Sequence, residues 1–109
     1  MSDLFVSPQA RADMEEIGDY ISRELCNPEA ALNMIRRLQA TMAPLRDLPE
    51  MGAPLLAAGQ QGVFYRYLVC GGYLIFYHVD ADTVYIDRVL YGRRDYLSLL
   101  FEKELTEED

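Results

Sequence analysis

The region between residues 63 and 91 contains three consecutive segments with the composition of β-strands. Val63–Val69, Tyr73–Val79 and Thr83–Tyr91 are rich in β-branched and aromatic residues. Turn residues separate them, with Gly71-Gly72 in the first gap and Asp80-Ala81-Asp82 in the second. Connections this short join antiparallel neighbours. The sequence therefore predicts a three-strand antiparallel meander.

Two amphipathic helices are predicted before the meander, preceded by a short apolar strand at residues 4–6. Ser7-Pro8 and Asn27-Pro28 each supply a capping side chain followed by proline at the first helical position. Pro44 removes a backbone donor, so the second helix is expected to kink or tighten near Met42-Ala43. Charged residues, among them Asp13, are expected on the solvent-exposed face of the helices. The apolar stripes comprise Ala10, Met14, Ile17, Ile21 and Leu25 in the first helix, and Ala31, Leu32, Ile35, Leu38, Met42 and Leu45 in the second.

The predicted fold class is α+β, with an N-terminal strand and an antiparallel two-helix hairpin packed on a small antiparallel sheet. Residues 47–62 are expected to form a loop between the hairpin and the sheet. The spacing of Tyr96, Leu97, Leu100 and Phe101 predicts a short C-terminal helix. We expect one domain over residues 1–101 and an acidic tail over residues 102–109.

The turn at Gly71-Gly72 also predicts the strand register. A two-residue connection places Cys70 opposite Tyr73 and Arg66 opposite Tyr77. The face toward the helices is then expected to carry Phe64, Arg66, Leu68, Ile75, Val84, Ile86, Arg88 and Leu90. The opposite face is expected to carry Tyr65, Tyr67, Leu74, Phe76, His78, Tyr85, Asp87 and Tyr91.

Composition limits the function classes. The formal net charge is −8, and residues 60–101 hold four basic and four acidic side chains, so broad nucleic-acid binding is not expected. No apolar run approaches the roughly 18 residues of a membrane span, and the N-terminus lacks a basic signal-peptide start. We expect a cytoplasmic protein with no membrane contact. Cys26 and Cys70 lack metal-ligand spacing, so we expect no disulfide, metal or cofactor.

Several segments resemble the RelE/ParE family of bacterial toxins. The resemblance is centred on residues 73–77 (YLIFY), 88–91 (RVLY) and 92–95 (GRRD), and residues 48–52 are similar to the Pro-containing turn after the family's helical hairpin. It extends from about Ser7 to Leu100. It implies the toxin of a type II toxin–antitoxin pair. The implied partner is an antitoxin whose disordered C-terminal segment folds on the toxin, with DNA contacted only through the antitoxin.

Arg93 and Arg94 are the leading candidate site residues. They follow a strand and a glycine and precede Asp95, and spacing alone fits a solvated pair bonded to Asp95 equally well. In the ribonuclease branch of the family, an arginine matching Arg94 stabilises the phosphate at the scissile bond. The resemblance therefore implies a functional role for Arg94, with Arg93 beside it.

Arg66, Arg88 and His78 are weaker candidates. A guanidinium within an apolar face needs hydrogen-bonding partners, and Asp87 or Glu50 would serve, so a structural role is favoured for both arginines. The resemblance adds antitoxin contacts to that role. His78 is the single histidine, and without a paired nucleophile or carboxylate it favours a structural or surface role.

The tyrosines of the predicted strands help to choose between a topoisomerase poison and an RNA-cleaving enzyme. Tyr65, Tyr67, Tyr85 and Tyr91 would form half-buried packing, a partner-binding groove or a base-stacking surface. RNA-cleaving relatives carry Lys or Arg at the positions of Tyr65, Tyr67 and Leu74. We therefore favour a ParE-like poison of a bacterial topoisomerase, typically DNA gyrase. The alternatives are an mRNA endonuclease acting in the ribosomal A site through Arg94, Arg93 and His78, and a non-toxic antitoxin-binding module.

Overall fold

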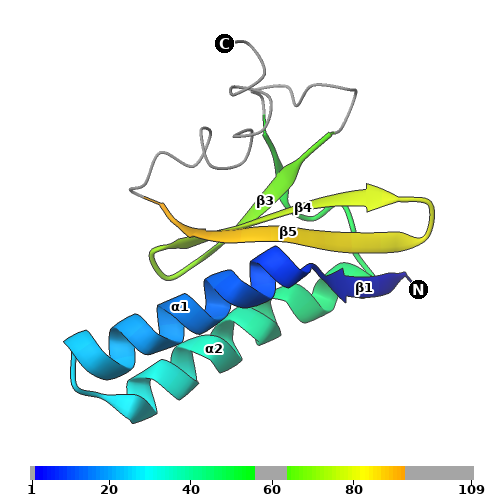
Figure 1. Ribbon diagram of the computed structural model, residues 1–109. Coiled ribbons are helices and arrows are strands. Elements are labelled where there is room, and N and C mark those ends of the chain that lie inside the picture. Colours follow the sequence, from blue (N-terminus) through cyan, green and yellow to red (C-terminus); the bar gives the residue numbers. More distant parts are fainter. Residues whose placement is uncertain (1, 56–63, 93–109) are drawn as a thin grey trace, which may run out of the picture.

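A computed structural model describes residues 2–55 and 64–92, which form a helical hairpin beneath a five-stranded sheet (Figure 1). The predicted C-terminal helix, the acidic tail, Arg93 and Arg94 lie outside the described residues. The elements in chain order are β1 (Asp3–Val6), α1 (Pro8–Glu24), α2 (Pro28–Met42), the 3-10 helix η1 (Ala43–Arg46), β2 (Ala53–Pro54), β3 (Arg66–Cys70), β4 (Tyr73–Asp80) and β5 (Thr83–Tyr91).

Both helices begin where the cap-plus-proline signals predict. Ala10 N donates to Ser7 Oγ at 3.0 Å, and Ala30 N donates to Asn27 Oδ1 at 3.0 Å. α2 gives way to η1 at Ala43, which confirms the predicted tightening before Pro44. At the hairpin tip, where both helices extend past the sheet (Figure 1), Leu25 and Leu32 are exposed rather than buried, because no strand covers them there.

The sheet has the order β1-β5-β4-β3-β2, so the first strand lies at one edge, parallel to the last. The predicted pairs of Cys70 with Tyr73 and Arg66 with Tyr77 are confirmed. Gly71 supports this hairpin with a φ of 60°, which glycine adopts without strain. β2 was not predicted, because it is a two-residue pairing with β3 inside the expected loop.

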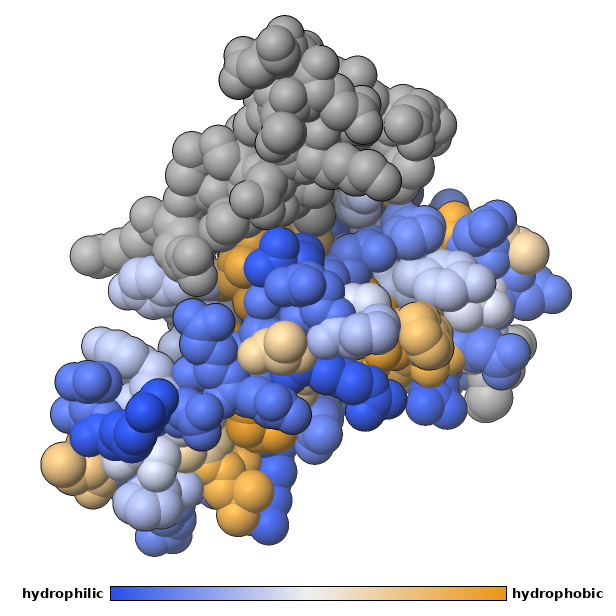
Figure 2. All heavy atoms as spheres, in the orientation of Figure 1, coloured by the Kyte–Doolittle hydropathy of each residue, from blue (hydrophilic) through white to orange (hydrophobic). Residues whose placement is uncertain are grey.

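The core lies between the hairpin and one sheet face. Figure 2 shows hydrophilic residues over most of the helical surface, with hydrophobic patches between them. Inside, side chains from both helices meet those of the three long strands. The buried core residues are Ala10, Met14, Ile17, Ile21, Ala31, Leu38, Met42, Leu45, Cys70, Ile75, Tyr77, Val84, Ile86 and Val89.

A β-bulge at Asp87 changes the predicted faces of β5. Tyr77 pairs with Ile86 while the preceding Phe76 pairs with Arg88, so Asp87 is the extra residue of β5. Beyond the bulge the alternation is shifted by one position, and Val89 takes the core position opposite Ile75. The predicted placement of Arg88 and Leu90 in the core-facing row was therefore wrong. Tyr91, paired with Tyr73, was likewise assigned to the wrong face.

Candidate functional site

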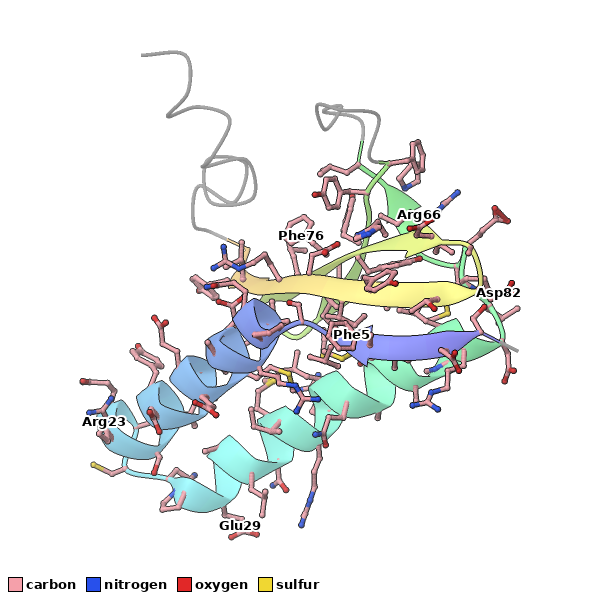
Figure 3. The ribbon with its side chains drawn as sticks, turned by 45° about the vertical axis from the view of Figure 1, so that its right-hand side comes forward. Phe5, Arg23, Glu29, Arg66, Phe76 and Asp82 are labelled. Atoms are coloured by element: carbon pink, nitrogen blue, oxygen red, sulfur yellow. The ribbon has the colours of Figure 1, made fainter. Side chains whose placement is uncertain are left out.

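A row of four aromatic rings crosses the sheet on the face away from the helices. Phe5 of β1 (labelled in Figure 3) contacts Tyr85 of β5 edge-on, with ring centroids 5.8 Å apart. The Tyr85 ring stacks on His78 of β4 at 5.1 Å and 13°, and His78 meets the ring of Tyr65 at 5.9 Å. These four residues, called the aromatic row below, come from β1, β5, β4 and the segment just before β3, and they lie on one surface.

A second aromatic pair lies next to the aromatic row. Tyr67 of β3 and Phe76 of β4 face each other with ring centroids 6.2 Å apart. Phe76 is fully buried, and Figure 3 shows it on the side of the sheet away from the helices. Tyr65 and Tyr67 therefore lie on the face predicted from their alternation, together with Tyr85.

His78 has a carboxylate partner that sequence reasoning did not assign to it. Its Nδ1 lies 2.6 Å from Oδ2 of Asp87, and the two side chains are 27% and 22% exposed. Burial raises the pKa of Asp87 above its ordinary value, while the hydrogen bond and charge of His78 oppose that rise. The bulge creates this pair by placing the extra residue of β5 beside the histidine of β4.

Arg66 ties β3 to the loop after η1. Its Nη1 donates to the carbonyl oxygens of Gly52 at 2.9 Å and Glu50 at 3.3 Å, and its guanidinium carbon lies 5.3 Å from the centroid of the Phe64 ring. Glu50 thus acts through its backbone rather than its carboxylate. Phe64 is 60% exposed, so it covers the arginine instead of packing on the helices as predicted.

The same loop is held by Tyr77. Its hydroxyl accepts a hydrogen bond from Gly52 N at 2.9 Å and donates to Pro49 O at 2.8 Å. Burial raises the pKa of Tyr77 above its ordinary value, so the phenol remains protonated as this geometry requires. A hollow of about 230 Å³ lies beside the loop, lined by Pro49, Glu50, Phe64, Arg66, Tyr77, His78 and Val79.

Arg88 binds helix α1 rather than either predicted partner. Its Nε donates to Asp13 Oδ2 at 2.8 Å and its Nη2 donates to Oδ1 at 3.0 Å. The Val89 backbone N also donates to Oδ2 at 2.9 Å. The arginine and aspartate side chains are 16% and 7% exposed. Asp13 was predicted to lie in solvent, and its role was missed because its partners follow it by 75 positions or more in the chain.

The candidate residues are therefore divided between two faces. Tyr65, Tyr67 and His78 belong to the outer face, whereas Tyr91 lies on the helix side with Tyr73. Within residues 2–55 and 64–92, no group of three His, Cys, Asp or Glu side chains is arranged to hold a metal ion. No helix in those same ranges has the length and apolar character needed to cross a membrane.

Comparison with known proteins decides the family. The family model described as "ParE toxin of type II toxin-antitoxin system, parDE" matches residues 4–96. The chain belongs to the ParE toxin family. Toxin ParE1 of Caulobacter vibrioides is 36% identical over 93 residues, covering 84% of this chain and 90% of that relative.

The ParE fold is also recognised from the coordinates. A solved structure of the chromosomal ParDE toxin–antitoxin system from P. aeruginosa is similar with a TM-score of 0.70, covering 84% of this chain and 96% of that one. At 22% sequence identity this likeness establishes the fold alone. The expected RelE/ParE-like α+β architecture is confirmed.

Proposed function

We propose that this ParE-family toxin acts in the bacterial cytoplasm by binding and poisoning a type II topoisomerase, DNA gyrase, and that a cognate antitoxin neutralises it. The action is binding rather than catalysis by this chain. Growth arrest then follows from blocked replication. Family membership supports the toxin–antitoxin assignment, and the chemistry of the outer face supports binding over RNA cleavage.

The observation that carries the proposal is the state of the two strand arginines. Arg66 donates to backbone carbonyls and Arg88 to a buried carboxylate, so both guanidiniums are held by groups of the chain itself. Stabilising the phosphorane of a cleaved RNA requires cations aimed at the reacting phosphate. Tyr67 of β3 and Tyr65, the residue before it in the alternation, stand at positions where the resemblance implies Lys or Arg in RNA-cleaving relatives. The outer face is better suited to docking an apolar partner surface.

The antitoxin is proposed to bind the outer face through a disordered C-terminal segment that folds on contact. Aromatic anchors such as Tyr65 and Tyr67 would supply buried area, and the partner-binding set extends to Arg66, Arg93 and Arg94. For Arg88, the ion pair with Asp13 argues for an indirect contribution through the geometry of β5. DNA would be contacted only by the antitoxin.

One observation favours the second candidate, an mRNA endonuclease. A histidine whose Nδ1 is held by a carboxylate has its other ring nitrogen oriented for proton transfer, and His78 and Asp87 form such a pair. Arg94 and Arg93 would then contact the phosphate. The pair alone does not supply the cations that this reaction needs.

Induction of the toxin in cells without its antitoxin separates the candidates. Double-strand DNA breaks and messenger RNA ends are mapped in the same cultures, and the variants His78→Gln and Arg94→Ala are induced at matched protein levels. The proposal predicts DNA breaks with intact messages, both in the parent toxin and in His78→Gln. Codon-positioned message cleavage that His78→Gln abolishes would establish the nuclease instead, and unaffected growth would indicate a non-toxic antitoxin-binding module.

A further inference from the structure

A second recessed surface lies on the helix side of the sheet, remote from the aromatic row. This cavity of about 390 Å³ opens between α1 and the paired ends of β4 and β5. Its volume is within the range of pockets that bind small-molecule ligands. Among the described residues it is lined by Asp13, Glu16, Ile17 and Tyr20 from α1 and by Tyr73, Val89, Leu90 and Tyr91 from the sheet. We call it the tyrosine pocket.

Three phenol rings from three elements converge there. The rings of Tyr73 and Tyr91 lie 5.7 Å apart at 60°. Burial raises the pKa of Tyr73, and the neighbouring Tyr91 and Tyr20 raise it further, as expected for phenols that share one small space. Tyr20 is 55% exposed and Tyr91 is 42% exposed, so these rings do not complete the core. Both side chains therefore remain partly accessible to solvent at the pocket.

Two carboxylates, Asp13 and Glu16, belong to the described lining of the tyrosine pocket. Both oxygens of Asp13 are occupied by Arg88 and Val89 N. Glu16 makes no hydrogen bond or ion pair within the described parts of the chain, and it is one of the residues that line the pocket. Helix α1 carries five acidic and two basic side chains, and the whole chain has a formal charge of −8. No described lining residue of the pocket is cationic.

We propose that the tyrosine pocket binds the guanidinium group of an arginine side chain presented by a protein partner. Phenol rings attract cations through their negative π-faces, and a planar guanidinium stacks on such faces while donating to a carboxylate. Glu16, whose carboxylate has no partner among the described residues, supplies that acceptor. An anionic group would meet the negative charge of α1, and a neutral apolar group would gain nothing from the Glu16 carboxylate.

The pocket opens to solvent beside the exposed Tyr20 and Tyr91, which favours an arginine side chain carried by a peptide over a free small cation. The exposed halves of Tyr20 and Tyr91 form a rim, which would contact the chain that carries the guanidinium. The negative charge of the toxin attracts a basic segment to this side. The inference does not depend on which target the toxin poisons.

Titration of the intact toxin with blocked Gly-Arg-Gly, followed by NMR through the signals of Tyr20, Tyr73 and Tyr91, tests the proposal. The matched probe is Gly-citrulline-Gly, which has nearly the same shape and no charge. We expect saturable shifts with the arginine peptide and affinity at least about tenfold lower for citrulline. Equal binding of both peptides, or no shift with arginine at several millimolar, would overturn the proposal.

Variants and a small cation complete the test. Glu16→Gln and Tyr20→Leu replace exposed side chains, and each is expected to weaken arginine binding by roughly threefold to tenfold. Glu15→Gln makes the same charge change on the neighbouring residue, which does not line the tyrosine pocket, and should leave binding unchanged. Ethylguanidine should bind more weakly than the peptide. If it binds as tightly, the pocket recognises free organic cations and the assignment to a protein partner is wrong.

Discussion

The carboxylate of Asp13 on α1 is fully engaged by β5, with Arg88 donating to both oxygens and the Val89 backbone N donating to one of them. This pair fixes the first helix against the last strand just beyond the bulge. Because the aspartate is 7% exposed, its charge depends on these donors rather than on water.

Removal of either Asp13 or Arg88 alone should strongly destabilise the fold. Asp13→Ala leaves the Arg88 charge without its carboxylate and is expected to lower the free energy of unfolding by about 3–5 kcal/mol. Urea denaturation measures this loss. Glu15→Ala, on an exposed position of the same helix, should stay within about 0.5 kcal/mol of the parent. The double variant with Arg88→Ala should lose less than the sum of the single changes, and strict additivity would contradict a direct interaction.

The hydroxyl of Tyr77 is predicted to stabilise the loop after η1. Tyr77→Phe leaves Gly52 N and Pro49 O without their partner and should cost about 1–3 kcal/mol in unfolding free energy. Tyr85→Phe is the control, since the Tyr85 hydroxyl makes no hydrogen bond within the described residues. If both variants are equally stable, the loop is not held by this hydroxyl.

Two glycines should respond to alanine in opposite directions. A Cβ on Gly52 would lie 2.6 Å from Tyr77 Oη and 2.8 Å from Tyr67 O, so Gly52→Ala should destabilise the fold by about 1–3 kcal/mol. A Cβ on Gly18 meets Ile35 at 3.8 Å, an ordinary contact. Since Gly18 lies inside α1, Gly18→Ala should raise the unfolding free energy by about 0.5–1 kcal/mol. Thermal unfolding of the two variants checks both signs.

The raised pKa of Asp87 predicts a dependence of stability on pH. The folded state holds the proton more tightly than the unfolded chain, so this group's contribution is fully present below its unfolded pKa and is lost as pH rises through the folded pKa. Relative to Asp87→Asn, the parent should therefore lose stability as the pH rises above the ordinary Asp pKa of 3.8 and through the raised pKa of the folded state. Denaturant unfolding at a series of pH values, starting below 3.8, measures the difference in stability between the parent and Asp87→Asn. If the parent gains stability relative to Asp87→Asn as the pH rises, the raised pKa of Asp87 is contradicted.

Arg94 should be required for toxicity under either mechanism. The resemblance implies that Arg94→Ala weakens growth inhibition, because the arginine belongs to the proposed partner-binding set and would also contact phosphate in a nuclease. Colony formation after induction measures the effect at equal protein levels. Arg23→Ala, a charge removal in the last turn of α1, should retain full toxicity. Full toxicity of Arg94→Ala would remove this residue from the site.

Local signals in the sequence were sufficient for most of the fold. Ser7 and Asn27 with their following prolines set both helix starts, and Gly71-Gly72 set the register of β3 and β4. Each of these signals acts within a few residues of the element that it fixes. The match to the RelE/ParE pattern then placed the elements in one known arrangement.

Those local signals did not predict the bulge in β5 or its consequences. The sequence does carry one sign of the extra residue in β5, since Arg88 falls in the predicted core-facing row and the apolar Val89 falls in the outer row. A hydrogen-bonded arginine on that face explains the same pattern, and no glycine marks the bulge. The extra residue moved Val89 into the core, turned Tyr91 toward the helices and paired Asp87 with His78. The contact of Arg88 with Asp13 was equally hidden, since it depends on how α1 lies against β5.

The most direct test of the account uses purified components. Supercoiled plasmid, DNA gyrase and ATP are incubated with the toxin, and protein-linked linear DNA is measured after detergent and protease treatment. In parallel, the same toxin is added to ribosomes translating a defined message. The account predicts accumulation of linear DNA, its suppression by the cognate antitoxin, and an intact message. Codon-positioned cleavage of the message with gyrase unaffected would contradict it.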